Sequence, residues 1–313
     1  MNWISRLRRE AWRGWAESAS PDLEEPLLSS AFLKRIEGLS LMVGRRGTTG
    51  FVGEHSSVRK AHSVEFADYR DYRPGDDIRL IDWNVYARLG QLTLRLTEAA
   101  EATTLHLLLD CSASMAFGAP SKFRTMQRIA AALGCLALAR YDSVTITLLR
   151  AEEAHVLPRL RAKNETGRLL SVLEDLKPRG ALDFPAAVRS FCAKPHRGLC
   201  VVISDLMAPM NLEESLGSLR RIGLEPAVIQ VLAPEEAQPR IEGAFDLMDC
   251  ETGATLLTQI NAPALRAYAA RFAGWTAELE AACLVQHAPF IRLLTNQPLE
   301  EVLFTAIRGR FVQ

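Results

Sequence analysis

The chain reads Leu105-His-Leu-Leu-Leu-Asp-Cys-Ser-Ala-Ser114 about a third of the way along its 313 residues. A short, nearly continuous apolar run of this kind is typical of a β-strand that is buried on both faces of a parallel sheet. The polar residues that follow would then lie at the carboxyl end of that strand. Open α/β sheets bind ligands at such ends, so this stretch predicts both a fold class and the place of a site.

Strands and helices alternate from this stretch onward. Apolar periodicity predicts strands over residues 143–149, 155–160, 199–206, 226–232 and 290–294, and helices over 122–140, 165–176, 185–192, 212–222 and 263–287. A hairpin over 245–257 and a C-terminal helix complete the pattern. Such alternation predicts an α/β domain with a doubly wound, mainly parallel sheet over residues 103–313.

Two further regions precede this domain. Residues 1–43 are expected to form N-terminal helices, of which the first, over 3–15, is basic and amphipathic. That helix either lies on its own protein or contacts a partner, and any contact with a membrane surface would go through residues 1–16. Residues 44–102 begin glycine-rich and continue charged and aromatic, with an alternating strand over 92–98, and we expect a small charged β-rich subdomain there.

The composition excludes several classes of protein. Lys plus Arg and Asp plus Glu both number 37, so no net field attracts nucleic acid. The six cysteines are scattered without a C-x-x-C pair, which predicts reduced, mostly buried thiols rather than zinc ligands. No apolar stretch reaches the roughly 20 residues of a spanning helix, and the N-terminus lacks the apolar region of a signal peptide. We therefore expect a cytoplasmic protein.

Two strand ends carry candidate metal ligands. Asp110, Ser112 and Ser114 follow the first strand, and Asp205 follows the run Cys200-Val-Val-Ile-Ser. If these strands are neighbours, the carboxylates and hydroxyls converge on an exposed rim and offer the hard oxygen ligands that Mg²⁺ or Mn²⁺ prefers. The alternative is structural, with the serines capping the next helix and the Asp110 carboxylate accepting from backbone amides.

The segment from Phe66 to Trp83 is too charged for a core and too aromatic for a linker. Its alternating charges either pair within a salt-bridged subdomain or form a docking surface for another protein. The residues that would carry the docking are Arg73, Asp76, Asp77, Arg79, Asp82 and Trp83.

Enzyme chemistry is not indicated. No histidine follows a strand to activate a serine, and neither a phosphate-binding G-x-x-x-x-G-K-[ST] loop nor a dinucleotide-binding G-x-G-x-x-G motif is present. The sequence therefore predicts a non-enzymatic protein. A metal-dependent hydrolase, with a water between the two carboxylates, is the remaining enzymatic alternative.

Two motifs carry a family resemblance. LLLDCSASM, residues 107–115, resembles the metal-ion-dependent adhesion site (MIDAS) loop of von Willebrand factor A domains. EFADYRDYRPGDDIRLIDWNVYARLGQLTLRLTEAA, which begins at Glu65, resembles the signature of the bacterial domain-of-unknown-function family fifty-eight (DUF58). The likeness runs from about residue 44 to 311 and implies a von Willebrand A-type fold.

The resemblance also implies a role and a ligand set. It implies a cytoplasmic, chaperone-like adaptor that works with a MoxR-type AAA ATPase in the assembly or activation of other proteins. Asp110, Ser112 and Ser114 would be direct metal ligands, Asp205 would reach the metal through water, and a carboxylate of the client protein would complete the coordination.

One position departs from the family pattern. Relatives carry a threonine ligand in a Gly-Gly-Thr-Asp stretch, whereas this chain reads Gly180-Ala-Leu-Asp183. Leu182 has no ligating atom, so Asp183 or water would have to fill that place. An alternative reading is that the metal site has degenerated and that the segment from Phe66 to Trp83 is the docking surface.

Overall fold

The computed structural model describes residues 26–35, 64–72, 76, 81–99, 103–140, 142–208 and 210–298. The chain divides into two compact units, of which one is Phe51–Ala102 and the other combines Met1–Gly50 with Thr103–Gln313. The expected amphipathic helix near the N-terminus and the expected helix at the C-terminus lie outside the described residues. None of the helices in the described ranges is both long enough and apolar enough to cross a bilayer.

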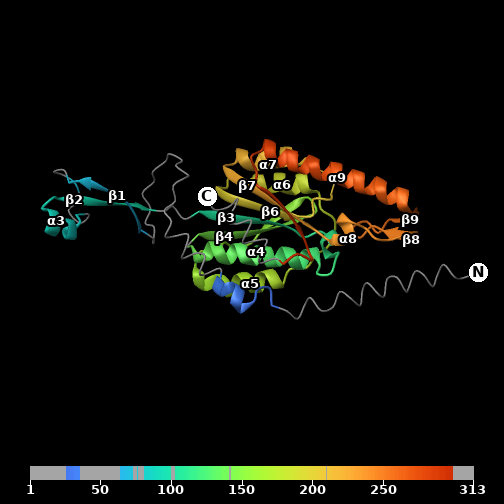
Figure 1. Ribbon diagram of the computed structural model, residues 1–313, viewed down its shortest axis with the longest axis horizontal. Helices are drawn as coiled ribbons and strands as arrows, with labels where there is room; N and C mark the ends of the chain where they lie inside the picture. The colour runs from blue at the N-terminus through green and yellow to red at the C-terminus, as the bar shows by residue number, and fades with distance from the viewer. Residues whose placement is uncertain are drawn as a thin grey trace, which may run out of the picture. The chain divides into compact units, whose positions relative to one another are not determined.

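The larger unit is built on one six-stranded sheet (Figure 1). Its strand order is β10-β7-β6-β3-β4-β5, with β3 in the interior and neighbours parallel except for β4 and β5. The strands are β3 (Thr104–Asp110), β4 (Ser143–Arg150), β5 (Glu153–Val156), β6 (Gly198–Ser204), β7 (Leu224–Leu232) and β10 (Phe290–Leu294). Counted along the chain, this order reads 6-5-4-1-2-3, which is that of a doubly wound sheet. The predicted α/β fold with a mainly parallel sheet is confirmed.

The edge strand β5 differs from its prediction. It was expected over residues 155–160, but it spans Glu153–Val156 and pairs antiparallel with β4. Arg150 pairs with Glu153, so only two residues form the turn, and Ala151 takes a positive φ of 47° there. A turn this short can only reverse the chain, which explains the antiparallel edge.

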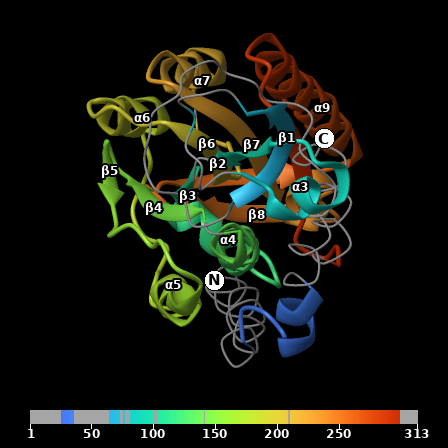
Figure 2. The ribbon, with the colours of Figure 1, turned by 90° about the vertical axis from the view of Figure 1, so that its left-hand side faces the viewer.

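Helices cover both faces of the sheet (Figure 2). On one face lie α4 (Lys122–Ala139) and α5 (Thr166–Glu174); on the other lie α6 (Phe184–Cys192), α7 (Leu212–Arg221) and α9 (Ala262–Val285). Leu107 packs into the first core and its neighbour Leu108 into the second, and both are fully buried. Strands whose two faces are both covered must be apolar throughout, which is why β3 reads as a leucine run.

Smaller elements complete this unit. The helical residues 30–35 belong to the helices expected over residues 1–43, and Leu27, Leu28 and Phe32 join the core on the α4 face. The predicted hairpin is formed by β8 (Gly243–Met248) and β9 (Thr255–Ile260). A short helix that the sequence reading omitted, α8 (Pro234–Ala237), follows β7. All six cysteines are free thiols, and four of them are buried, as expected.

The smaller unit pairs β1 (Val64–Asp71) antiparallel with β2 (Thr93–Ala99) and places α3 (Trp83–Leu89) between them in sequence. β2 was predicted, whereas β1 and α3 were not. The carboxylate of Asp82 caps α3 by accepting from the amides of Asn84 and Val85, at 2.9 and 3.2 Å. Gly90 ends the helix in the left-handed region, as its lack of a Cβ allows.

Candidate functional site

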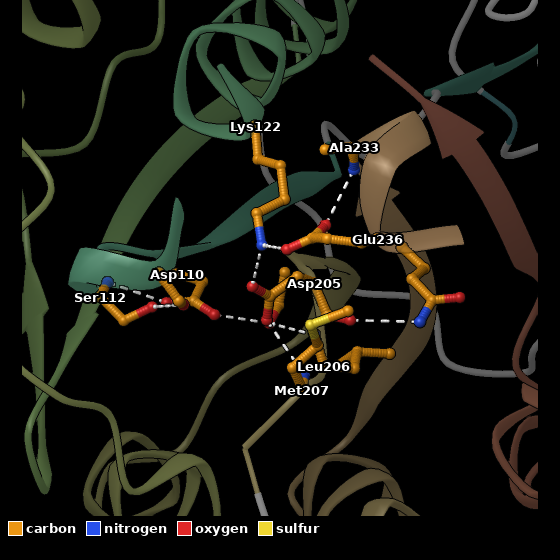
Figure 3. Close-up of polar contacts among 11 residues, drawn as sticks. Asp110, Ser112, Lys122, Asp205, Leu206, Met207, Ala233 and Glu236 are labelled. Carbon is orange, nitrogen blue, oxygen red and sulfur yellow. Dashed lines mark hydrogen bonds and ion pairs between the residues drawn. The ribbon is translucent and has the colours of Figure 1, made fainter. Parts of the chain in front are cut away.

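The ends of β3 and β6 meet, because the two strands are parallel neighbours. Leu109 pairs with Ile203, so Asp110 and Ser204 come next along their strands. The Ser204 hydroxyl donates to Asp110 Oδ2 at 2.6 Å and accepts from the amide of Leu206 at 2.9 Å. The structure thus brings Asp110 and Asp205 to one place, as their positions after the strands predict (Figure 3).

The serines lie on the loop that follows β3. The amide of Ser112 donates to Asp110 Oδ1 at 2.9 Å, and the hydroxyls of Ser112 and Ser114 hydrogen-bond each other at 2.9 Å. Ser112 makes no side-chain cap to the short 3-10 helix that follows, and α4 is capped by Ser121 instead. Of the structural alternative, only the backbone bond to Asp110 is present.

The expectation of an exposed rim is wrong. The exposed fractions are 3% for Asp110, 1% for Ser112 and 2% for Asp205, and only Ser114 is half-buried. The first turn of α4 places Lys122 against Asp205, and the short helix α8 places Glu236 against Lys122. A client protein's carboxylate could not approach these groups without displacing these side chains.

A buried lysine that the sequence reading missed lies at the centre of the site. Lys122 is fully buried, and its Nζ lies 2.6 Å from Asp205 Oδ2 and 2.5 Å from Glu236 Oε1 (Figure 3). Glu236 belongs to α8, and its other oxygen accepts from the amide of Ala233 at 2.8 Å. The ammonium therefore joins the start of α4, the end of β6 and α8.

Burial and charge act in opposite directions on these groups. Burial acts to lower the pKa of Lys122, but Asp205 and Glu236 raise it more, so its pKa lies above the ordinary value and the group is an ammonium. Burial, followed by the charge of Asp205, raises the pKa of Asp110 to about 6 against the opposing hydrogen bonds from Ser112 and Ser204. The cluster thus holds one firm positive charge and one carboxylate that is reluctant to ionise.

The segment at 180–183 lies beside the serine loop, as the family pattern implies. The carbonyl of Gly180 accepts from the amide of Ala113 at 2.7 Å. Leu182 is buried in the core on the α6 face. Asp183 is exposed and caps α6, accepting from the amide of Ala186 at 2.9 Å. Neither side chain replaces the missing threonine hydroxyl, because one is apolar and the other is engaged at a helix end.

The residues present do not fit a divalent ion. Each of the six carboxylate oxygens of Asp110, Asp205 and Glu236 already accepts a hydrogen bond, from an amide, a hydroxyl or the ammonium of Lys122. Mg²⁺ in proteins is held by one or two carboxylates at about 2.0–2.1 Å together with water, and an ion that drew on Asp205, directly or through water, would compete with the ammonium already there. Among the described residues, no group of three or more His, Cys, Asp or Glu side chains is arranged to hold a metal ion.

The predicted docking residues are only partly described. Arg73, Asp77 and Arg79 lie outside the described residues. Asp76 is half-buried, and Asp82 is the cap of α3. Trp83 is 60% exposed, and it stands edge-on to Tyr86 with ring centroids 6.1 Å apart.

Comparison with known sequences finds relatives that carry the description "Uncharacterized protein". The uncharacterized protein Rv1480 of Mycobacterium tuberculosis is 27% identical over 298 residues, which cover 92% of each chain. The uncharacterized protein YeaD of Bacillus subtilis is 32% identical over 96 residues, which cover 31% of this chain and 23% of YeaD.

Solved structures include distant likenesses. BatB, a conserved hypothetical protein from Bacteroides thetaiotaomicron, matches at 18% identity and a TM-score of 0.43 over 66% of this chain and 97% of its own. The VWA domain of SpRpn10 matches at 12% identity and a TM-score of 0.39 over 65% of this chain and 95% of its own. At these values no functional conclusion follows from the likeness.

The family is set by a sequence model. The model described as "Protein of unknown function DUF58" matches residues 68–277, which is about two thirds of the chain. The match spans both the small unit's charged segment and the strand ends that hold Asp110 and Asp205. The chain therefore belongs to the DUF58 family.

Proposed function

We propose that this protein is a non-enzymatic adaptor that docks onto a MoxR-type AAA ATPase through helix α3 and helps the ATPase assemble or activate other proteins. The observation that carries the proposal is the exposed apolar face of α3. The exposed fractions are 60% for Trp83, 44% for Tyr86 and 69% for Leu89, and none of the residues of this helix is buried.

Exposed aromatic side chains at this spacing favour a protein-binding surface. Residues 83, 86 and 89 recur every three positions, so they share one side of the helix. Trp and Tyr are enriched among the residues that contribute most to binding energy, since their large apolar area leaves water when a partner covers it. The cap at Asp82 and the left-handed Gly90 fix both ends of this short helix. The surface is therefore ordered before a partner arrives, which lowers the entropy cost of binding.

The choice of partner rests on the family resemblance, and the charged residues 73, 76, 77 and 79 nearby in sequence would add polar contacts. A catalytic role for the serine loop has little support. The hydroxyls of Ser112 and Ser114 bond each other. His106, the histidine nearest in sequence, lies inside β3 with its ring against Phe191 and His196.

Metal-dependent capture of a client carboxylate stays a prediction of the resemblance. The buried carboxylates, the ammonium of Lys122 and the apolar Leu182 all weigh against it. The metal-dependent hydrolase also stays a prediction. The same features weigh against it, because it needs the same two carboxylates to hold a metal ion and a water.

The docking proposal is tested by binding measurements between the full chain and a purified MoxR-type AAA ATPase from the same genome. A Trp83→Ala, Tyr86→Ala double variant is expected to bind at least about tenfold more weakly, because two anchor side chains are lost. Leu284→Ala is the matched control, since Leu284 is 76% exposed but lies on α9 of the other unit.

The Asp110→Asn variant separates the two sites. Docking through α3 predicts that it binds like the wild-type protein. If the Trp83→Ala, Tyr86→Ala variant bound normally and Asp110→Asn lost binding, the ATPase would bind at the strand ends, and the proposal would be rejected.

A further inference from the structure

Lys122 occupies a position that is unfavourable unless something compensates for it. It is the first residue of α4, where the helix dipole gives a partial positive charge. Its side chain is nevertheless fully buried. An isolated ammonium in such a place would lose its hydration and be repelled by the helix end, so its partners must account for its presence.

Those partners come from two distant parts of the chain. Asp205 follows β6, and Glu236 lies on α8, which begins soon after β7 ends. The two carboxylates approach the same Nζ at 2.6 and 2.5 Å, and the ring of Phe117 lies 5.9 Å from it. Two carboxylates and an aromatic face form a complete set of partners for one cation.

A divalent ion would compete with this ammonium. A dication beside Asp205 would stand within a few ångströms of a buried positive charge, where the low dielectric makes repulsion strong. The remaining carboxylate oxygens accept from the amides of Ser112, Met207 and Ala233 and from the Ser204 hydroxyl. Lys122 occupies an oxygen of Asp205 and one of Glu236, and Leu182 has no oxygen that could take their place as a metal ligand.

We propose that the ammonium of Lys122 is the built-in cation of this site, that it joins α4, β6 and α8, and that the site works without a divalent metal. The proposal goes beyond the docking role of α3 and does not depend on it. It concerns the fold at the carboxyl edge of the sheet, which the resemblance would assign to Mg²⁺ or Mn²⁺.

The first test uses the wild-type full chain, freed of metal with EDTA and titrated with MgCl₂ and with MnCl₂. A site with a Kd of about 0.1 mM would raise the Tm by about 5 °C or more at about 5 mM metal. We expect no saturable heat in calorimetry and a Tm that does not move. A saturable heat with a matching rise in Tm, both abolished by Asp110→Asn, would overturn the proposal.

The second test removes the ammonium. Lys122→Met keeps most of the volume but leaves the buried Asp205 and the half-buried Glu236 without their cation, so the Tm is expected to fall by on the order of 10 °C. The control is Lys177→Met, which changes an exposed lysine on a loop and should leave the Tm unchanged. A Lys122→Met protein as stable as the wild type would overturn the proposal.

A third variant covers the case in which Lys122→Met does not fold. Glu236→Gln removes one of the two charges that face the ammonium and keeps an oxygen that can accept from the Ala233 amide. We expect a smaller fall in Tm than for Lys122→Met, with no restoration by Mg²⁺. An unchanged Tm in this variant would contradict the role given to Glu236 and, with it, the proposed link between α4, β6 and α8.

Discussion

Asp110 accepts its hydrogen bonds from neutral groups, the Ser112 amide and the Ser204 hydroxyl, whereas Asp205 and Glu236 each contact the ammonium of Lys122. Burial, and then the charge of Asp205, raises the pKa of Asp110 to about 6, above the roughly 4 of an unfolded aspartate. The folded state therefore holds the proton more tightly. The stability that this group contributes is fully present below about pH 4 and is lost as the pH rises through about 6.

Asp110→Asn should remove this pH dependence. As the pH rises from 4.5 to 7.5, the unfolding free energy of the wild type should fall by about 2 kcal/mol relative to that of the variant. The reason is that only the wild type must ionise a buried carboxyl group. Urea unfolding of both proteins at the two pH values measures this. A bound metal ion would lower the pKa of Asp110, and the difference between the proteins would then change in the opposite direction.

Gly198 and Gly180 are both in the left-handed region, with φ of 118° and 73°, but their surroundings differ. A Cβ on Gly198 would lie 2.2 Å from the carbonyl oxygen of Thr104, whereas one on Gly180 would meet nothing within 4 Å. Gly198→Ala should cost about 3 kcal/mol or more, and Gly180→Ala about 1 kcal/mol from backbone strain alone. Equal losses in chemical unfolding would contradict the close approach of β6 to β3.

At the scale of elements, strong periodicity made the larger unit predictable. β10 matches its predicted bounds, and α7 differs by one residue. Prediction from the sequence failed where the elements are short or charged. α3 begins where the segment interpreted by its charge alternation ends, and it was not predicted although Asp82 before it and Gly90 after it are ordinary cap signals. α8 spans four residues, below the length at which periodicity is visible.

The residues of the candidate site likewise fall into those that the sequence could predict and those that it could not. Asp110 and Asp205 could be predicted, because residues that follow parallel strands share one edge of the sheet. Lys122 and Glu236 could not, since Lys122 lies 83 positions from Asp205 and 114 positions from Glu236, and nothing local marks either contact. The one signal was a lysine at the first position of a helix, where a cation is unfavourable unless it is paired.

The cap of α3 gives a prediction for that element. Asp82→Ala removes the oxygen that accepts from two amides and should destabilise the helix by about 1 kcal/mol, which corresponds to roughly fivefold weaker ATPase binding. Asp82→Asn keeps a capping oxygen and should bind like the wild type. Titrations that show equal weakening in both variants would assign Asp82 a charge contact with the partner rather than a structural role.

In the molecule as a whole, folding and docking depend on different units. The larger unit has its own cores on both faces of its sheet, whereas α3 belongs to the unit Phe51–Ala102. A variant in which residues 51–102 are replaced by a short Gly-Ser linker should keep the cooperative thermal unfolding of the α/β unit and lose ATPase binding. Circular dichroism and a binding titration check both parts, and retained binding would exclude α3 as the dock.

Hydrogen exchange on the full chain, measured with and without the AAA ATPase, asks directly whether α3 is the docking helix. We expect the partner to slow exchange at the amides of Trp83–Leu89 and to leave the loop at 110–114 unchanged. Protection at 110–114 with none over α3 would reject docking through α3 and locate the partner at the strand ends instead.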